Sequence, residues 1–143
     1  MSATPPLAFA DIRVGDELTP LELNLDATKI VAGAIASRDF MPVHHDRDYA
    51  QSQGAPDIFM NILSTNGYIA RFLTDWAGPQ AMVKNIRIRL GAPAIPGQLL
   101  RFTGKVFAVR RDQGEGVVEV SLAATAEAGD HASGTAQLTF PLD

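Results

Sequence analysis

The chain has 143 residues, of which 46% are hydrophobic and 20% charged, and its formal net charge is -4. This length suits one domain with a hydrophobic core, and the acidic balance argues against nucleic acid, whose binding needs clustered Lys and Arg. The lack of cysteine excludes a disulfide scaffold and a thiol nucleophile. Because the sequence shows no signal peptide and no apolar run near the ~18 residues of a membrane span, we expect a cytoplasmic protein without a membrane partner.

The N-terminal half predicts one strand followed by helical and loop segments. We expect a loose, Pro-rich lead-in over residues 1–10 and a single domain over residues 11–143. Three segments then show strand or helix periodicity: a half-buried strand over residues 21–25, a helix over residues 27–36, and a long helix from Ile58 to Phe72 or slightly beyond.

The C-terminal half has the alternating pattern of strands separated by Gly-containing turns. Four strands are predicted, over residues 82–90, 99–110, 117–126 and 132–142. We expect them to form a four-strand antiparallel meander, so the fold class is α+β, with a curved sheet wrapped around a long central helix that is buried along most of its length. The unpaired edges of such a sheet favour dimerisation edge to edge.

An acid and a histidine lie five positions apart between the two predicted helices, at Asp39 and His44. Pro42 keeps this segment from being helical, so the chain can curl back and direct both side chains at one point. The backbone N–H groups at the start of the long helix could face the same point. An acid, a base and an anion-stabilising helix end are the components of a site that moves protons on a carbonyl compound.

The run Ala-Ser-Arg-Asp-Phe-Met-Pro-Val-His over residues 36–44 resembles the hydratase signature A-x-S-G-D-x-N-P-x-H of the MaoC-like (R)-specific enoyl-CoA hydratases. The resemblance covers about residues 11–140. It implies the hot-dog fold, with Asp39 and His44 as catalytic residues that add water across the 2,3-double bond of an enoyl-CoA thioester. Coenzyme A would then be part of the substrate, and no cofactor is expected.

This sequence departs from the family pattern at three places. Arg38 replaces the Gly before the Asp, Met41 replaces the Asn two residues after it, and Met60-Asn61 replaces the His-Gly that opens the long helix. Because that Gly gives a backbone N–H to the thioester oxygen, the resemblance implies that the Asn61 backbone amide does so here.

The runs around residues 38–48, 57–63 and 74–79 look closest to the small subunits of heteromeric enoyl-CoA hydratases that act on steroid side chains. This likeness implies a bulky or steroid-derived acyl chain. The partner is expected to be a second copy, in a homodimer, or a second MaoC-like subunit, in a heterodimer or heterotetramer. Two alternatives are a non-catalytic or half-site subunit that completes a partner's pocket, and a hot-dog thioesterase. The thioesterase would need a carboxylate on the central helix, and none lies between Ile58 and Thr74.

Several further residues receive roles by position. Met41, Met60 and Ser64 are expected to line the substrate pocket, although the two methionines are equally compatible with the core. Partial burial is expected to raise the pKa of the Asp39 carboxyl toward working pH. We expect no metal site, because the adjacent His44 and His45 point apart in an extended chain, and we expect His131 to be a solvated residue at a strand end.

Overall fold

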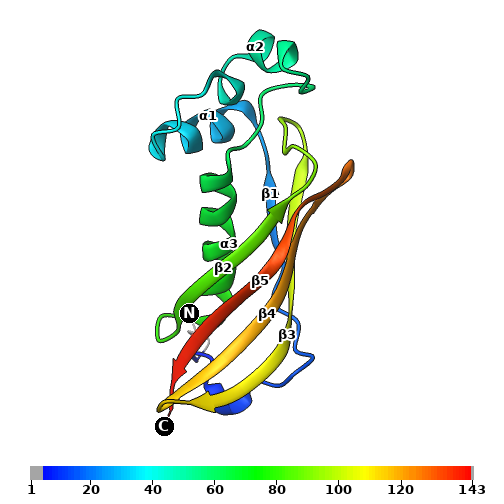
Figure 1. Ribbon diagram of the computed structural model, residues 1–143. Helices are drawn as coiled ribbons and strands as arrows, with labels where there is room; N and C mark the ends of the chain where they lie inside the picture. The colour runs from blue at the N-terminus through cyan, green and yellow to red at the C-terminus, as the bar shows by residue number, and fades with distance from the viewer. Residues whose placement is uncertain (1–4, 143) are drawn as a thin grey trace.

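The computed structural model describes residues 5–142 and contains a five-stranded antiparallel sheet with a long helix along one face (Figure 1). The helical elements are η1 (Phe9–Asp11), α1 (Ala27–Ala36), η2 (Pro42–His44), α2 (Arg47–Ser52) and α3 (Ile62–Ala77). The strands are β1 (Leu21–Asn24), β2 (Met82–Leu90), β3 (Leu99–Asp112), β4 (Glu115–Ala126) and β5 (Gly129–Pro141). The predicted α+β class is therefore confirmed, and α1 and β2 have the predicted bounds.

The strand order is β1-β3-β4-β5-β2, so the predicted four-strand meander is wrong. Only β3, β4 and β5 follow one another, while β2 pairs with β5 and β1 pairs with β3. The connection after β2 explains this order. Gly91 N–H donates to the His131 carbonyl and Gly97 N–H donates to the Leu25 carbonyl, so the loop runs across the end of the sheet from β5 to β1. As a result, β1 and β2 are the two edge strands.

Helix α3 begins at Ile62, four residues after the predicted start at Ile58. Asn61 is its N-cap, because the Asn61 side-chain oxygen accepts a hydrogen bond from the Ser64 amide at 3.1 Å. The two preceding amides are held elsewhere: Phe59 N–H donates to the Val43 carbonyl and Met60 N–H to the Ala94 carbonyl. These bonds keep the chain extended before the helix and connect it to two loops.

One face of α3 is buried against the sheet and the opposite face is open. Ile69, Phe72 and Leu73 are buried, and the Phe72 ring lies 6.3 Å from the Phe102 ring of β3. Each such side chain contributes about 1.5–3 kcal/mol of burial free energy. Ile62 and Leu63 on the other face are 46% and 52% exposed, so the prediction of a helix buried along most of its length holds for one face only.

The predicted loose lead-in is only partly within the described residues, since residues 1–4 lie outside them. Leu7 and Phe9 pack against the hydrophobic core, and the Phe9 ring lies directly over Gly116, where a Cβ atom would collide with it. The expectation of a loose segment therefore does not hold for residues 7–10. No helix within residues 5–142 is both long and apolar enough to cross a membrane.

Candidate active site

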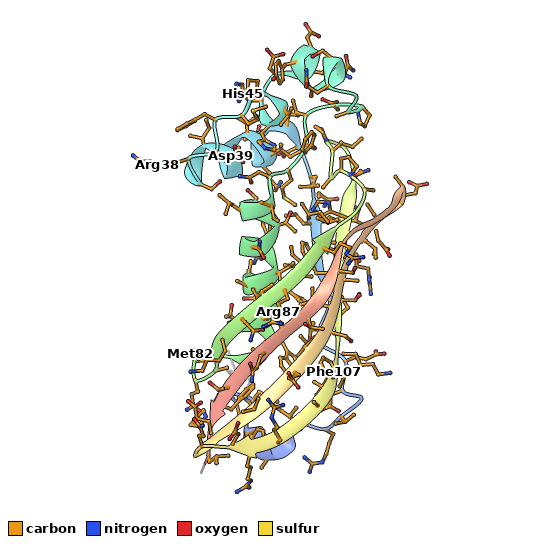
Figure 2. The ribbon with its side chains drawn as sticks, viewed as in Figure 1. Arg38, Asp39, His45, Met82, Arg87 and Phe107 are labelled. Atoms are coloured by element: carbon orange, nitrogen blue, oxygen red, sulfur yellow. The ribbon has the colours of Figure 1, made fainter. Side chains whose placement is uncertain are left out.

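The C-terminal end of α1 places Asp39. Ser37 is the C-cap, Arg38 N–H donates to the Ile35 carbonyl, and Asp39 N–H donates to the Ala34 carbonyl at 2.9 Å, which is the Schellman pattern. Arg38 has φ of 58°, a left-handed conformation that favours glycine and that accounts for the Gly at this place in the hydratase signature. Figure 2 shows Arg38 and Asp39 together at the end of the molecule that carries α1.

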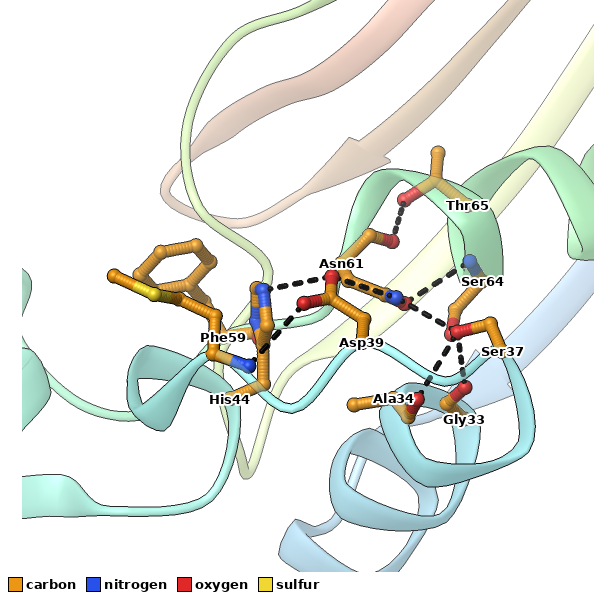
Figure 3. A network of polar contacts seen from close by, with 10 residues as sticks. Gly33, Ala34, Ser37, Asp39, His44, Phe59, Asn61, Ser64 and Thr65 are labelled. Atoms are coloured by element: carbon orange, nitrogen blue, oxygen red, sulfur yellow. Dashed lines mark hydrogen bonds and ion pairs between the residues drawn. The ribbon is translucent and has the colours of Figure 1, made fainter.

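The short helix η2 and the loop before α3 place His44. Its Nδ1 lies 2.6 Å from the Phe59 carbonyl oxygen. Its ring makes an edge contact with the Phe59 ring, and the two ring centroids are 5.1 Å apart. A carbonyl oxygen only accepts hydrogen bonds, so Nδ1 carries a proton and the neutral imidazole leaves Nε2 without one. That Nε2 faces Asp39 Oδ2 at 3.3 Å (Figure 3).

The facing atoms of this pair are both acceptors when Asp39 is ionised and His44 is neutral. Neither can then donate to the other, but each can accept one hydrogen of the same water molecule. A water bound in this way has its oxygen activated for attack, and the proton that it loses stays next to the reacting atoms. The arrangement is therefore suited to addition or removal of water.

Hydrogen bonds to Asp39 set its ionisation. Asn61 Nδ2 donates to Asp39 Oδ2 at 3.1 Å and the Met41 amide donates to Asp39 Oδ1 at 3.3 Å. The Asn61 hydrogen bond is the largest cause that lowers the pKa of Asp39; burial opposes it, and the Met41 amide and the charge of a protonated His44 add to it. The prediction that partial burial raises this pKa is wrong, because the donors outweigh the desolvation.

A cavity of about 280 Å³ contains the pair. It is lined by Asp39, His44, Phe59, Met60, Asn61, Ile62, Leu90, Gly91, Ala92, Pro93 and His131. Among residues 5–142, the backbone amides of Asn61 and Ile62 have no hydrogen-bond partner, as expected for the first N–H groups of a helix. The cavity thus combines an acid–base pair with free amides at the positive end of α3.

The structure brings four of the predicted site residues together and leaves two apart. Asp39, His44, Met60 and Asn61 line the same cavity. Met41 is 48% exposed outside it. Ser64 lines a second hollow of about 370 Å³ between α1 and α3. Its hydroxyl is buried and has no hydrogen-bond partner among the described residues.

His131 also lines the cavity, although the sequence predicts a solvated residue. It is only 3% exposed; its Nδ1 lies 2.8 Å from the Ala92 carbonyl oxygen, and its Nε2 lies 2.8 Å from the Thr65 hydroxyl. Burial lowers its pKa, and the hydrogen bond to Ala92 opposes this. The prediction is wrong because β5 begins at Gly129, ahead of the predicted start at residue 132, and pairing with β2 carries His131 under the Gly91 loop.

Histidines and carboxylates do not gather elsewhere in a way that suggests a metal centre. Within residues 5–142 there is no group of three His, Cys, Asp or Glu side chains placed to hold a metal ion. His44 faces Asp39, whereas the neighbouring His45 is exposed.

Residues 12–128 match the family model described as "MaoC like domain". The chain belongs to this family. Its MaoC-like domain is 44% identical, over 127 residues, to the 3-oxo-4,17-pregnadiene-20-carboxyl-CoA hydratase beta subunit of Mycobacterium tuberculosis. The alignment covers 89% of this chain and 95% of that subunit.

Two solved structures share the architecture of this chain. A chain of the ChsH1-ChsH2 complex from Mycobacterium tuberculosis superposes with a TM-score of 0.83 at 43% identity, covering 90% of this chain and 98% of that one. The (R)-hydratase from A. caviae involved in PHA biosynthesis superposes with a TM-score of 0.82 at 19% identity, covering 92% and 98%. The fold is the hot-dog fold.

Proposed function

We propose that this MaoC-like chain is an enoyl-CoA hydratase, a hydro-lyase that adds water across the 2,3-double bond of an enoyl-CoA thioester. The observation that carries the proposal is the 3.3 Å approach of Asp39 Oδ2 to the Nε2 atom of His44 within the cavity. The coenzyme A moiety enters as part of the substrate, and the reaction requires no further cofactor.

In this reaction the water oxygen bonds to C3 while the C2–C3 double bond breaks and its electrons move toward the thioester oxygen. Asp39 and His44 hold the water through its two hydrogens, and one of them takes a proton as the C–O bond forms. The same proton then passes to C2, so atoms and charge balance and the pair returns to its starting state. The facing atoms of the two groups lie 3.3 Å apart, and the proton is assigned to the pair.

The negative charge that develops on the thioester oxygen needs a donor. The backbone amide of Asn61 is free among the described residues and lies at the start of α3, where the helix dipole also favours an anion. We assign the oxyanion contact to this amide. Loss of one such donor typically costs about 2.7–4 kcal/mol of transition-state stabilisation.

We assign a bulky, steroid-derived acyl chain as the substrate, from the 44% identity to a subunit of a hydratase that is named for a pregnadiene-carboxyl-CoA. The cavity of about 280 Å³ is smaller than the roughly 300–1,000 Å³ pockets that enclose drug-sized ligands. An acyl chain of this size therefore needs walls from elsewhere. Met60 supplies an apolar wall inside the cavity, and Met41 and Ser64 lie outside it, where they would contact the distal part of the chain.

The missing walls are assigned to a second MaoC-like subunit. Large apolar side chains are exposed where α1 ends and α3 begins, the elements that meet at Asp39: Ile35, Phe40, Met41, Ile62 and Leu63. Exposed apolar surface of this kind marks an interface or a ligand groove. A relative of similar length is a component of the ChsH1-ChsH2 complex, which favours a heteromeric assembly over a homodimer.

A half-site subunit without its own chemistry is the second candidate, and the open face of α3 favours it. The hot-dog thioesterase is disfavoured, because Asp75 is the one carboxylate on α3 and it is exposed and paired with Arg71. The three cases differ in which chain must carry the acid–base pair and in whether the thioester survives.

The test is co-expression of this chain with the second MaoC-like subunit, followed by assays of crotonyl-CoA and of a steroid side-chain enoyl-CoA. We expect loss of the enoyl absorbance, no release of free thiol, and preference for the bulky substrate. Free thiol without hydration would overturn the hydratase assignment. Full activity with both Asp39→Asn and His44→Asn in this chain would assign it the half-site role.

A further inference from the structure

The polarity of the Asn61 side chain is fixed by its surroundings. Asn61 is 1% exposed, and its Oδ1 accepts from the Ser64 amide, which is a donor only. The NH₂ group must therefore point the other way, where Nδ2 lies 2.8 Å from Ser37 Oγ and 3.1 Å from Asp39 Oδ2. Ser37 in turn donates its hydroxyl proton to the Gly33 carbonyl at 2.7 Å, so it accepts from Asn61. Every hydrogen-bonding atom of the Asn61 amide is used (Figure 3).

We propose that the Asn61 side chain is a positioning residue, which holds the Asp39 carboxylate in the orientation that faces His44 Nε2. The proposal rests on the proposed hydratase function and extends it to a side chain at the position of the glycine in the family's His-Gly pair, which opens the long helix. A glycine there offers only its backbone amide. Asn61 has the same backbone amide and, with its side chain, adds a donor to the acid of the pair.

Other groups around Asp39 do not replace this contact. The titratable groups that line the cavity with Asp39 are His44 from η2 and His131 from β5, and His131 is engaged with Thr65 and Ala92. When the His44 ring is neutral, its Nε2 carries no proton and gives no hydrogen bond to the carboxylate. The Met41 amide binds the other oxygen, Oδ1, at the longer distance of 3.3 Å. Asn61 thus donates to Oδ2, the oxygen that faces His44, whether or not His44 carries a second proton.

The capping role of Asn61 can be separated from this positioning role by substitution. Asn61→Ser keeps an N-cap acceptor for the Ser64 amide but lacks the reach of the amide donor. Asn61→Leu keeps the number of side-chain heavy atoms, lacks both functions, and leaves no space for a water in place of the amide. Asn66→Ser is the matched control, because Asn66 lies on the same helix and its side chain bonds only to the Ile62 carbonyl.

Two measurements on the assembled complex test the proposal. The first is titration of the Asp39 side-chain carboxyl by carbon NMR without substrate, and the second is the pH profile of kcat and of KM for enoyl-CoA hydration. We expect the pKa of Asp39 to rise in both Asn61 variants. We also expect kcat to fall by about 10- to 100-fold at neutral pH, the worth of a hydrogen bond to a charged group, while KM stays close to that of the unchanged chain.

The Asn66→Ser control should match the unchanged chain in both measurements. A shift in Asn61→Leu alone still supports the proposal, since a water can replace the donor beside a serine. An unchanged Asp39 titration and unchanged kcat in both Asn61 variants would overturn it, and lower stability alone would reduce Asn61 to a helix cap. The NMR titration requires no turnover, so absence of hydratase activity in the unchanged complex would refute the proposed function separately.

Discussion

Two histidines from different elements line the same cavity and are held in the same way, yet their surroundings differ. His44, in the wall formed by η2, and His131, in the wall formed by β5, each direct Nδ1 at a backbone carbonyl, of Phe59 and of Ala92. A ring held in this way presents an unprotonated Nε2 when it is neutral. For His44 this atom faces the Asp39 carboxylate, and for His131 it accepts from the Thr65 hydroxyl.

The partner of Nε2 separates a reactive histidine from a structural one. With the Thr65 hydroxyl at Nε2 and the Ala92 carbonyl at Nδ1, both ring nitrogens of His131 are hydrogen-bonded. This ring therefore links β5 and the loop after Gly91 to α3, and neither nitrogen is free to bind a substrate. An ionised Asp39 cannot donate to a neutral His44, because both facing atoms are then acceptors, and a water beside the pair can donate one hydrogen to each. The Asp39–His44 pair should therefore control catalysis, and the Thr65–His131 pair should control stability.

The largest effect on kcat is expected at the Asp39–His44 pair, from Asp39→Asn. The new side chain keeps its size and can still accept from Asn61, but it cannot take a proton, so kcat should fall by about 100- to 10,000-fold. Steady-state hydration of an enoyl-CoA by the assembled complex measures this. Asp75→Asn, at an exposed carboxylate paired with Arg71 on α3, is the matched control and should leave kcat unchanged. Hydration at the normal rate in Asp39→Asn would remove this residue from the mechanism.

At the Thr65–His131 pair, Thr65→Val should destabilise the fold without a comparable loss of kcat. The substitution preserves shape and leaves the buried His131 Nε2 without a donor, which costs about 1–3 kcal/mol of unfolding free energy. Urea denaturation measures the loss. Thr74→Val provides the comparison, because Thr74 is exposed on the same helix and bonds only to backbone carbonyls one turn before it. Equal stability of the two variants would contradict the role given to Thr65.

His131 and Asp39 should also affect the free energy of unfolding in different pH ranges. Burial lowers the folded-state pKa of His131, so the unfolded chain binds the proton first as pH falls below about 6.5, and the fold loses stability there. Asp39 has a lowered pKa as well, but its contribution is present at neutral pH and is lost only in the acidic range of aspartate. Urea unfolding of His131→Asn between about pH 5 and 7 should therefore show a shallower pH dependence than the unchanged chain. Identical slopes would show that another group titrates.

The smallest effect is expected at Arg38, whose backbone directly precedes Asp39. Arg38 has φ of 58°, a left-handed conformation that glycine adopts without strain. Arg38→Gly should therefore raise the unfolding free energy by up to about 1 kcal/mol, after subtraction of the entropy that glycine adds to the unfolded chain. Thermal unfolding measures the change, and kcat should not move. Gln113→Gly, at φ of 50° in the β3–β4 turn, is a parallel test. A lower stability in both would mean that side-chain contacts outweigh backbone strain.

Local patterns in the sequence predict the type of the main elements and one half of the site. Residues 27–36 and 82–90 carry helix and strand periodicity in full, and α1 and β2 have these bounds. Pro42 and a short tether predict that Asp39 and His44 meet, and Asp39 Oδ2 lies 3.3 Å from His44 Nε2. The predicted start of α3 is wrong, because the extended path of residues 58–60 depends on hydrogen bonds to Val43 and Ala94, which sequence periodicity does not indicate.

The sequence by itself therefore determined the α+β class, the family and the acid–histidine pair, since each depends on residues that are neighbours along the chain. Tertiary structure alone decided the strand order, the burial of His131 and the use of the Asn61 side chain. The contacts responsible join residues far apart: Asn61 and Ser37 are separated by 24 positions, and Thr65 and His131 by 66. The lowered pKa of Asp39 has the same origin, because its main cause is a donor from α3 that approaches only when α1 and α3 pack together.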